Sequence, residues 1–363
     1  MSKLKALQND TYNQHYIAQV EQRFNAIDST IDKKNREIYA FSIQDRANYK
    51  LGNPSKVEIK YNLSVNDLYT FERIDEKFRL NFERFFEEYE NQLFPATSHL
   101  ITKINNCNTE IRQELIDIFK LKILNNFRNP YCIEQTLNTF DDLQKYRPSD
   151  NVLNEIYQKI ENNRNNETRA RAEELRVSEN DYIQWIKSLF LLLTIDFEDC
   201  QNIFDKSIER IFNDSRKIIH VSINSYTGEY GDKYVALSDR SFVLLQNSPT
   251  QLVYQFNLSA TVLLTYSFTD KNDSLFSDVY EEAHQLGISI SPELVEKIIG
   301  NRNIIPQIKK NDLNALDEIN IDILISNAAV GYGGSIIDID TEKFRYSYEV
   351  NVLSNFELIK KVI

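Results

Sequence analysis

The chain has 363 residues, of which 42% are apolar, a length and composition that suit two globular domains or one large one. Gly and Pro number only 8 and 7, which excludes collagen-like and low-complexity classes. The formal net charge is −12. This acidic balance argues against a nucleic-acid partner, because proteins that bind nucleic acids usually carry a basic patch.

The three cysteines, Cys107, Cys132 and Cys200, lie far apart and form no C-x-x-C pair. This spacing argues against a disulfide framework or a zinc ribbon and favours a reducing compartment. The first residues carry no apolar signal region, and the longest apolar run, Leu189–Leu193, is too short to cross a bilayer. We therefore expect a cytoplasmic protein without a membrane partner, and we expect the apolar run to be a buried helix.

The first 80 residues mix two patterns. Residues 1–35 have apolar positions at helical spacing, whereas Glu37–Ile43 and Val57–Leu63 alternate like strands. A turn is expected between these strands at Gly52–Pro54. Asn66–Asp67 can cap a short helix.

Helical spacing dominates the middle of the chain. It continues to about residue 127 and resumes over residues 151–178 and 179–212. Aromatic residues recur at steps of three and four and predict a core-facing stripe rather than a ligand site; they are Phe78, Phe82, Phe85, Phe86 and Tyr89.

A β-rich segment follows over residues 217–268. The expected strands are Lys217–Asn224, Tyr234–Leu237, Ser241–Gln246 and Leu252–Ser267, the last with a break. Helical spacing returns near residues 278–286, and Gly300–Pro306 is the best domain boundary. The sequence thus predicts an α+β fold in which residues 1–300 form a predominantly helical main domain.

The segment after Pro306 has a different pattern. Ile321–Ile325 is a short apolar run of the kind found in buried parallel strands. Ser326–Ser335 follows it and contains three of the eight glycines, and small residues at a strand end allow a ligand to approach closely. A helical pattern then begins at Asp340–Thr341 and carries Tyr348–Val352.

Two of these motifs resemble the middle of a short-chain dehydrogenase/reductase. Ser326–Ala329 stands where that family has Asn-Asn-Ala-Gly at the end of its fourth strand, and Asn351–Val352 stands where it has Asn-Val on the next helix. The resemblance covers residues 308–363 and implies a truncated, Rossmann-like α/β fragment. It also implies that an NAD(P) cofactor would lie near Asn327, Ala328, Gly331 and Asn351.

The chain lacks the residues on which that chemistry depends. No G-x-x-x-G-x-G occurs, so the cofactor's pyrophosphate has no glycine-rich turn, and none of the 20 tyrosines has a Lys four positions later. We expect no dehydrogenase activity, and NAD(P) binding only if the fragment is functional. The fragment reads as the result of a gene fusion or truncation, and a protein partner could complete its sheet.

A second resemblance concerns residues 10–270. His15-Tyr16-Ile17-Ala18-Gln19 is similar to the His-Tyr-Val-Pro-Gln opening of a bacterial family of unknown function. That family continues with a strand like Ile38–Phe41, a helix with repeated Glu, and a later β segment like Phe242–Pro249. The family supplies no established activity to carry over, although some such families occur among toxin or phage-defence genes.

The best polar cluster in the sequence surrounds His15. If residues 15–23 were helical, His15, Gln19, Gln22 and Arg23 would share one side. We take His15 and Arg23 as candidate catalytic residues, or as the binding site for a phosphate; the alternative is an interhelical polar network. The histidines show no metal-ligand spacing, so no metal site is expected.

Three hypotheses follow from the sequence. The first is an interaction or defence-type protein with the region His15–Arg23 as its working surface. The second is an oxidoreductase-derived protein whose tail retains NAD(P) binding. The third is a nuclease that binds Mg²⁺ through Asp196, Glu198 and Asp199, for which a solvated helix end is the simpler explanation.

Overall fold

The computed structural model describes residues 3–45, 50–73, 79–106, 108, 110–226 and 235–271, together with strand 305–308. Its helices are α1 (Lys3–Leu7), α2 (Gln19–Arg23), α3 (Glu83–Asn105), α4 (Arg112–Phe127), α5 (Ile133–Thr139), α6 (Asn151–Glu161), α7 (Asn166–Leu175), α8 (Glu179–Thr194) and α9 (Ile203–Phe212). Short 3₁₀ turns lie at η1 (Lys33–Asn35), η2 (Ile59–Tyr61), η3 (Pro130–Cys132) and η4 (Asp141–Lys145).

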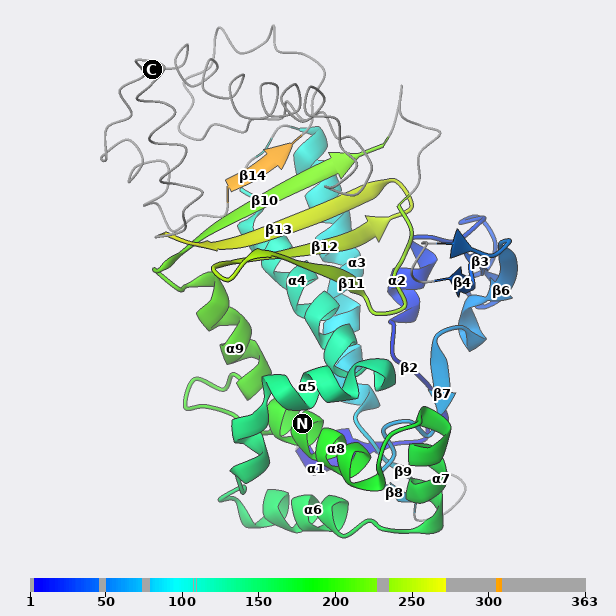
Figure 1. Cartoon of the computed structure of the whole chain (residues 1–363), viewed down its shortest axis with the longest axis vertical. Coiled ribbons are helices and arrows are strands. Elements are labelled where there is room, and N and C mark those ends of the chain that lie inside the picture. The colour runs from blue at the N-terminus through cyan, green and yellow to red at the C-terminus, as the bar shows by residue number, and fades with distance from the viewer. Residues whose placement is uncertain are drawn as a thin grey trace, which may run out of the picture.

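The main sheet contains β10 (Lys217–Ser225), β11 (Phe242–Ser248), β12 (Gln251–Ser259), β13 (Val262–Asp270) and β14 (Ile305–Ile308). Its strand order is β11-β12-β13-β10-β14, with antiparallel pairs except for the parallel pair of β10 with β14. Tight turns join β11 to β12 and β12 to β13, which is why these neighbours in sequence are also neighbours in the sheet. The sheet lies at one end of the molecule, with α5, α6 and α8 at the other (Figure 1).

Helix α4 joins these two ends. Near the sheet, Phe119 packs its ring against Tyr254, Phe256, Tyr266 and Phe268 with centroid distances of 5.1–5.5 Å. At the other end, the carbonyl of Phe127 accepts a hydrogen bond of 2.7 Å from Nε1 of Trp185 on α8. From Leu121 to Asn126 every side chain of α4 is buried, so the polar residues in this second half of the helix are removed from water.

The aromatic stripe is part of the same core. Phe82, Phe85, Phe86 and Tyr89 are buried, which confirms the core face for these four positions, and Phe78 lies outside the described residues. The apolar run Leu189–Leu193 is fully buried in α8, as expected for a central helix.

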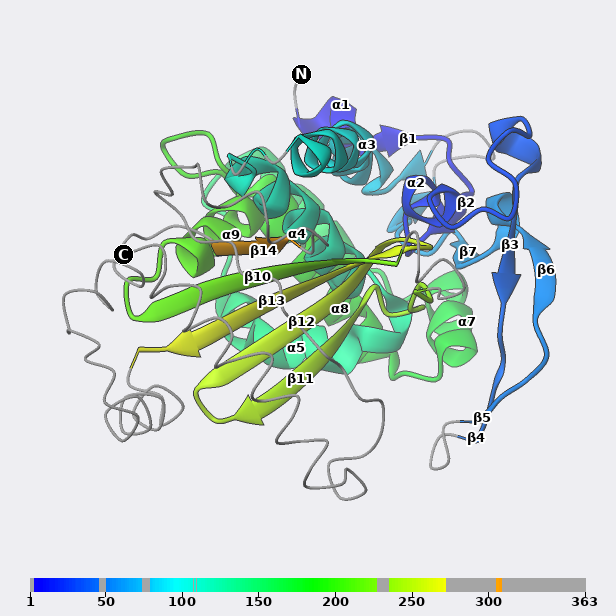
Figure 2. The same ribbon diagram turned by 90° about the horizontal axis from the view of Figure 1, so that it is seen from above.

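Several short strands form the N-terminal part. β1 (Gln8–Asn9), β9 (Arg79–Leu80) and β8 (Glu72–Arg73) form a small sheet, and β2 (Asn13–His15) pairs with β7 (Ser64–Asn66). β3 (Glu37–Ala40) pairs with β6 (Ser55–Glu58), and β4 (Ile43–Asp45) pairs with β5 (Lys50–Leu51). The last two pairs form a hairpin that extends away from the body (Figure 2). We call residues 31–61, which include this hairpin and its root, the arm.

The α+β class is confirmed, and the predicted β-rich segment is the main sheet. The middle helices also form, although each long predicted stretch is broken into two helices: 151–178 into α6 and α7, and 179–212 into α8 and α9.

Four local predictions are wrong. In the predicted strand Val57–Leu63, only Val57 and Glu58 belong to a strand, β6, and the 3₁₀ turn η2 follows. Residues 1–35 form only α1, α2, η1 and short strands, because the apolar positions serve pieces that pack separately. Asn66 and Asp67 do not cap a helix. Asn66 is the last residue of β7, and Asp67 has a φ of 51°, in the left-handed region, so the chain turns there. In the predicted strand Tyr234–Leu237, the described residues 235–237 are irregular, and the backbone N–H of Val235 donates to Ala260.

The strand β14 pairs with β10 at the edge of the main sheet, and its first two residues belong to the predicted domain boundary Gly300–Pro306. The predicted helix near 278–286 and the Rossmann-like fragment over 308–363 lie outside the described residues, apart from Ile308 at the end of β14.

Candidate functional site

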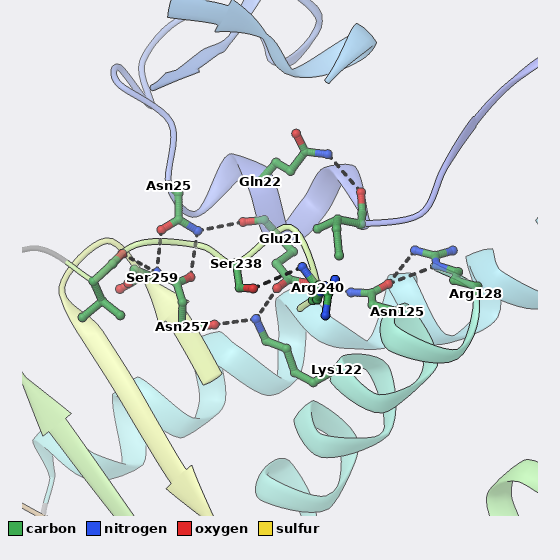
Figure 3. Close-up of polar contacts among 12 residues, drawn as sticks. Glu21, Gln22, Asn25, Lys122, Asn125, Arg128, Ser238, Arg240, Asn257 and Ser259 are labelled. Carbon is green, nitrogen blue, oxygen red and sulfur yellow. Dashed lines mark hydrogen bonds and ion pairs between the residues drawn. The ribbon is translucent and has the colours of Figure 1, made fainter. Parts of the chain in front are cut away.

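Buried polar side chains gather where α2, α4 and β12 meet (Figure 3). Helix α2 contributes Glu21, α4 contributes Lys122 and Asn125, and β12 contributes Asn257. Arg128 follows at the C-cap of α4. A globular core seldom buries this many charged groups, so their partners decide what the region does.

Lys122 and Glu21 form an ion pair whose two side chains are each 1% exposed. The ammonium of Lys122 also donates to the carbonyl oxygen of Asn257, and Asn125 Nδ2 donates to Glu21 Oε2 at 2.5 Å. Burial raises the pKa of Glu21 and lowers the pKa of Lys122, while the attraction between the two charges opposes both changes. These partners join α2, α4 and β12, which indicates a structural role.

Side-chain amides extend this junction. Asn25, just after α2, and Asn257 exchange two hydrogen bonds of 2.9 Å. On the other side, Asn126 donates to the carbonyl of Arg240 at 3.2 Å, and Asn129 donates to that of Asp239 at 2.6 Å. The turn before β11 is thereby fixed to the end of α4.

Arg128 is completely buried and lies against α3. Its Nη2 donates to Glu90 Oε1 at 2.7 Å, Asn125 Oδ1 accepts from Nε at 3.1 Å and from Nη2 at 2.7 Å, and its guanidinium lies over the ring of Phe86. Among the described residues, its buried Nη1 has no hydrogen-bond partner. Burial is the largest single effect and acts to lower the pKa of Arg128, but Glu90 and the other groups around the guanidinium together outweigh it, so the pKa is raised and the charge is retained.

His15, Gln19 and Arg23 form a hydrogen-bonded chain. The carbonyl of Ile59 lies 3.3 Å from His15 Nε2 and can only accept, so Nε2 carries the proton and Nδ1 accepts from Gln19 Nε2 at 3.4 Å. Gln19 Oε1 in turn accepts from Arg23 Nη2 at 2.6 Å. Burial lowers the pKa of His15 to about 4, with further lowering by Arg128 and Arg23, so His15 is neutral at pH 7.

The guanidinium groups of Arg23 and Arg128 interact electrostatically with the same two residues. Both act on His15, and the carboxylate of Glu90 acts on both. Arg23 is half-buried, and its Nε is a buried donor without a partner among the described residues. We call His15, Arg23, Glu83, Glu90 and Arg128 the arginine cluster.

Glu83 completes this cluster from the first turn of α3. Burial raises its pKa to about 8, the charges of Glu90 and Glu87 act in the same direction, and Arg128 opposes them. Glu83 therefore holds a proton at neutral pH. Its Oε1 is buried and has no hydrogen-bond partner among the described residues.

The predicted candidates His15 and Arg23 are thus brought together, with Gln19 between them. The expected helical arrangement is wrong in two respects: His15 ends strand β2, and helix α2 begins only at Gln19. Gln22 does not join them, because its Nε2 donates to the carbonyls of Ile17 and Asn62.

Sequence reasoning missed Lys122 and Arg128. Lys122 stands among the apolar residues Leu121, Ile123 and Leu124, which is a visible signal of a buried charge, although Lys120 interrupts the same helix at a partly exposed position. Arg128 gave no comparable signal, because an Arg at a helix end is usually solvated.

Two of the three residues of the nuclease hypothesis are paired with lysines. Asp196 binds Lys3 at 2.6 Å, and Asp199 binds Lys206 at 2.5 Å. Within the described part of the chain, no group of three His, Cys, Asp or Glu side chains could hold a metal ion. This arrangement gives the nuclease hypothesis no support.

The candidate cofactor residues Asn327, Ala328, Gly331 and Asn351 lie outside the described residues, so their role stays a prediction. In the part of the chain that is described, none of the helices combines the length and the apolar character needed to cross a membrane.

Comparisons with known proteins do not assign the chain to a family. The chain matches no protein-family model, no curated protein and no solved structure. The two resemblances described above therefore stay predictions, and the function is argued from the site alone.

Proposed function

We propose that the main body is a binding module for a small ligand that carries a phosphate or carboxylate group, held at the arginine cluster. This proposal names a ligand class for the first hypothesis, that of an interaction protein that works through His15 and Arg23. The observation that carries it is the completely buried guanidinium of Arg128 with an Nη1 that has no partner among the described residues. An unpaired buried donor is costly, and an oxyanion is the partner that a guanidinium binds most strongly.

The charge of the cluster supports an anion. At neutral pH His15 is uncharged and Glu83 is protonated, as their pKa values of about 4 and about 8 imply. Arg23 and Arg128 then carry two positive charges against the one negative charge of Glu90, so the cluster has a net charge of +1. Glu87, the other carboxylate near Glu83, is exposed to solvent.

Two members of the cluster reach the surface. The side chain of Glu90 is 26% exposed, and Arg23 is half-buried. Strongly shifted pKa values around one guanidinium, here those of His15 and Glu83 near Arg128, are typical of functional sites.

The test is thermal unfolding with millimolar inorganic phosphate or acetate. We expect phosphate, acetate or both to raise the unfolding temperature of the wild type, since a ligand that binds only the folded state stabilises it. The variant Arg23→Met should lose this response. Arg169→Met is the matched control, because Arg169 is exposed on α7 and its removal changes the net charge equally.

The two probes separate the ligand classes. A response to phosphate alone assigns a phosphate-bearing ligand, and a response to acetate alone assigns a carboxylate. The proposal is overturned if neither anion stabilises the wild type, or if Arg23→Met responds like the wild type.

A further inference from the structure

The arm combines exposed apolar side chains with positive charge. Residues 31–61 contain seven Lys or Arg and four Asp or Glu, a net charge of +3 in a chain of −12, so the remaining residues carry −15. Tyr39, Phe41 and Ile43 are each about half exposed, with relative exposures of 48%, 49% and 54%, and Leu51, the cross-strand partner of Ile43, is 55% exposed.

A hairpin of this kind is incomplete by itself. Two paired strands are marginally stable in water, and both outer edges carry backbone groups able to pair with another strand. Among the described residues, the buried side chains of the arm are Ile38 and Ile59, at its root. There the backbone N–H of Ile27 donates to the carbonyl of Glu37, and Asn13 donates to that of Lys60. In Figure 2 the far end, β4 and β5, lies well away from the main sheet.

A complementary surface lies on β11. This strand is at the outer position of the main sheet in the described strand order. It exposes three consecutive apolar residues, Val243, Leu244 and Leu245, with relative exposures of 48%, 40% and 40%. Large apolar side chains that are exposed elsewhere in the described residues do not form a run of this kind.

We propose that the arm of one chain docks on β11 of a second copy of the same chain, by addition of a strand to the sheet edge. Strand addition would satisfy backbone groups on both edges and cover both apolar surfaces. The charges also favour a second copy of the chain as the occupant. An arm with a net charge of +3 would meet a chain whose residues outside the arm carry a net charge of −15. A reciprocal exchange of arms gives a closed two-fold dimer, the commonest symmetry of soluble oligomers.

Sedimentation equilibrium of the full chain in the micromolar range tests the dimer. We expect the wild type to form a dimer, and the double variant Phe41→Ser/Ile43→Ser and the single variant Leu244→Ser to be monomers. Val152→Ser, which removes an exposed apolar residue from α6, should leave the dimer intact. A monomeric wild type overturns the proposal, and so does a folded arm or β11 variant that remains dimeric.

A second measurement does not depend on disrupting the surface. Ile43→Cys protein mixed with Leu244→Cys protein should form a disulfide between the two chains, whereas Ile43→Cys with Val152→Cys should not. Equal cross-linking in both mixtures contradicts the pairing. A third measurement is binding of the wild type to vesicles that contain anionic lipid. If the wild type binds and a monomeric arm variant does not, the arm binds a lipid surface and the proposal is overturned.

Discussion

The ammonium of Lys122 and the carboxylate of Glu21 meet in the interior, where neither side chain has appreciable contact with water. They come from positions 101 residues apart in the sequence, and the carbonyl of Asn257 and the amide of Asn125 fill further positions around them. Removing two charges from water is costly, so the pair is tolerated only because each partner is present.

We expect Lys122→Met to reduce the free energy of unfolding by about 3–5 kcal/mol, because Glu21 is left as a buried charge without its counterion. The double variant Lys122→Met/Glu21→Gln should recover part of this loss, since it removes both charges and keeps an acceptor for Asn125. Urea unfolding measures both values, and Lys145→Met, at an exposed position, should change stability by less than about 0.5 kcal/mol. A double variant less stable than Lys122→Met would contradict this account.

His15 should make the protein sensitive to acid. Its pKa is about 4 in the folded protein against an ordinary value of 6.5, so between these values the unfolded chain binds a proton that the folded chain does not. Stability is therefore lost as the pH falls through this range, by at most about 3 kcal/mol. Urea unfolding of the wild type and of His15→Gln at both ends of the range tests this, and parallel pH profiles would exclude the contribution of His15.

Glu83 should act in the opposite direction. Its pKa is about 8 in the folded protein against an ordinary value of 4.5, so the folded chain holds an extra proton between these values and loses stability as the pH rises. From about pH 6.5 to about pH 8, above the range of His15, the loss is about 2 kcal/mol. Glu83→Gln should remove this slope, whereas Glu88→Gln, at an exposed position of the same helix, should retain it.

Anion binding should follow the same titration. Above about pH 8 Glu83 carries a negative charge, which cancels the net positive charge of the arginine cluster. We expect the stabilisation by phosphate or acetate to decrease across this pH in the wild type. In Glu83→Gln the stabilisation should persist, and an equal decrease in both proteins would show that Glu83 does not control binding.

Arg176 offers a test of the fold at the end of α7. This residue has a φ of 59°, in the left-handed region that glycine adopts without steric cost. Arg176→Gly should raise the free energy of unfolding by roughly 0.5–1 kcal/mol, whereas Arg169→Gly inside the same helix should lower it by about 1 kcal/mol. Thermal unfolding of both variants measures this contrast, and a loss of stability in Arg176→Gly would contradict the observed helix end.

Periodicity was sufficient where one element buries one continuous surface. The aromatic positions of α3 recur at steps of three and four, and β13 alternates over most of its length, so the sequence predicts these elements directly. The run in α8 is continuous and is predicted by its apolar character instead. It was insufficient in residues 1–35, where helical turns and strands of two to five residues each pack against a different neighbour. Elements that short repeat their pattern too few times for their type to be recognised.

The candidate site shows the same division. The sequence by itself determined that His15, Gln19 and Arg23 are close, because they lie within nine positions of one another. Only the tertiary structure decided that Arg128 and Glu90 join them and that Lys122 finds Glu21, since these partners come from α3 and α4. The physical reason is burial: a charge in water needs no particular partner, whereas a charge on the enclosed helix α4 must be matched by a group that folding brings to it.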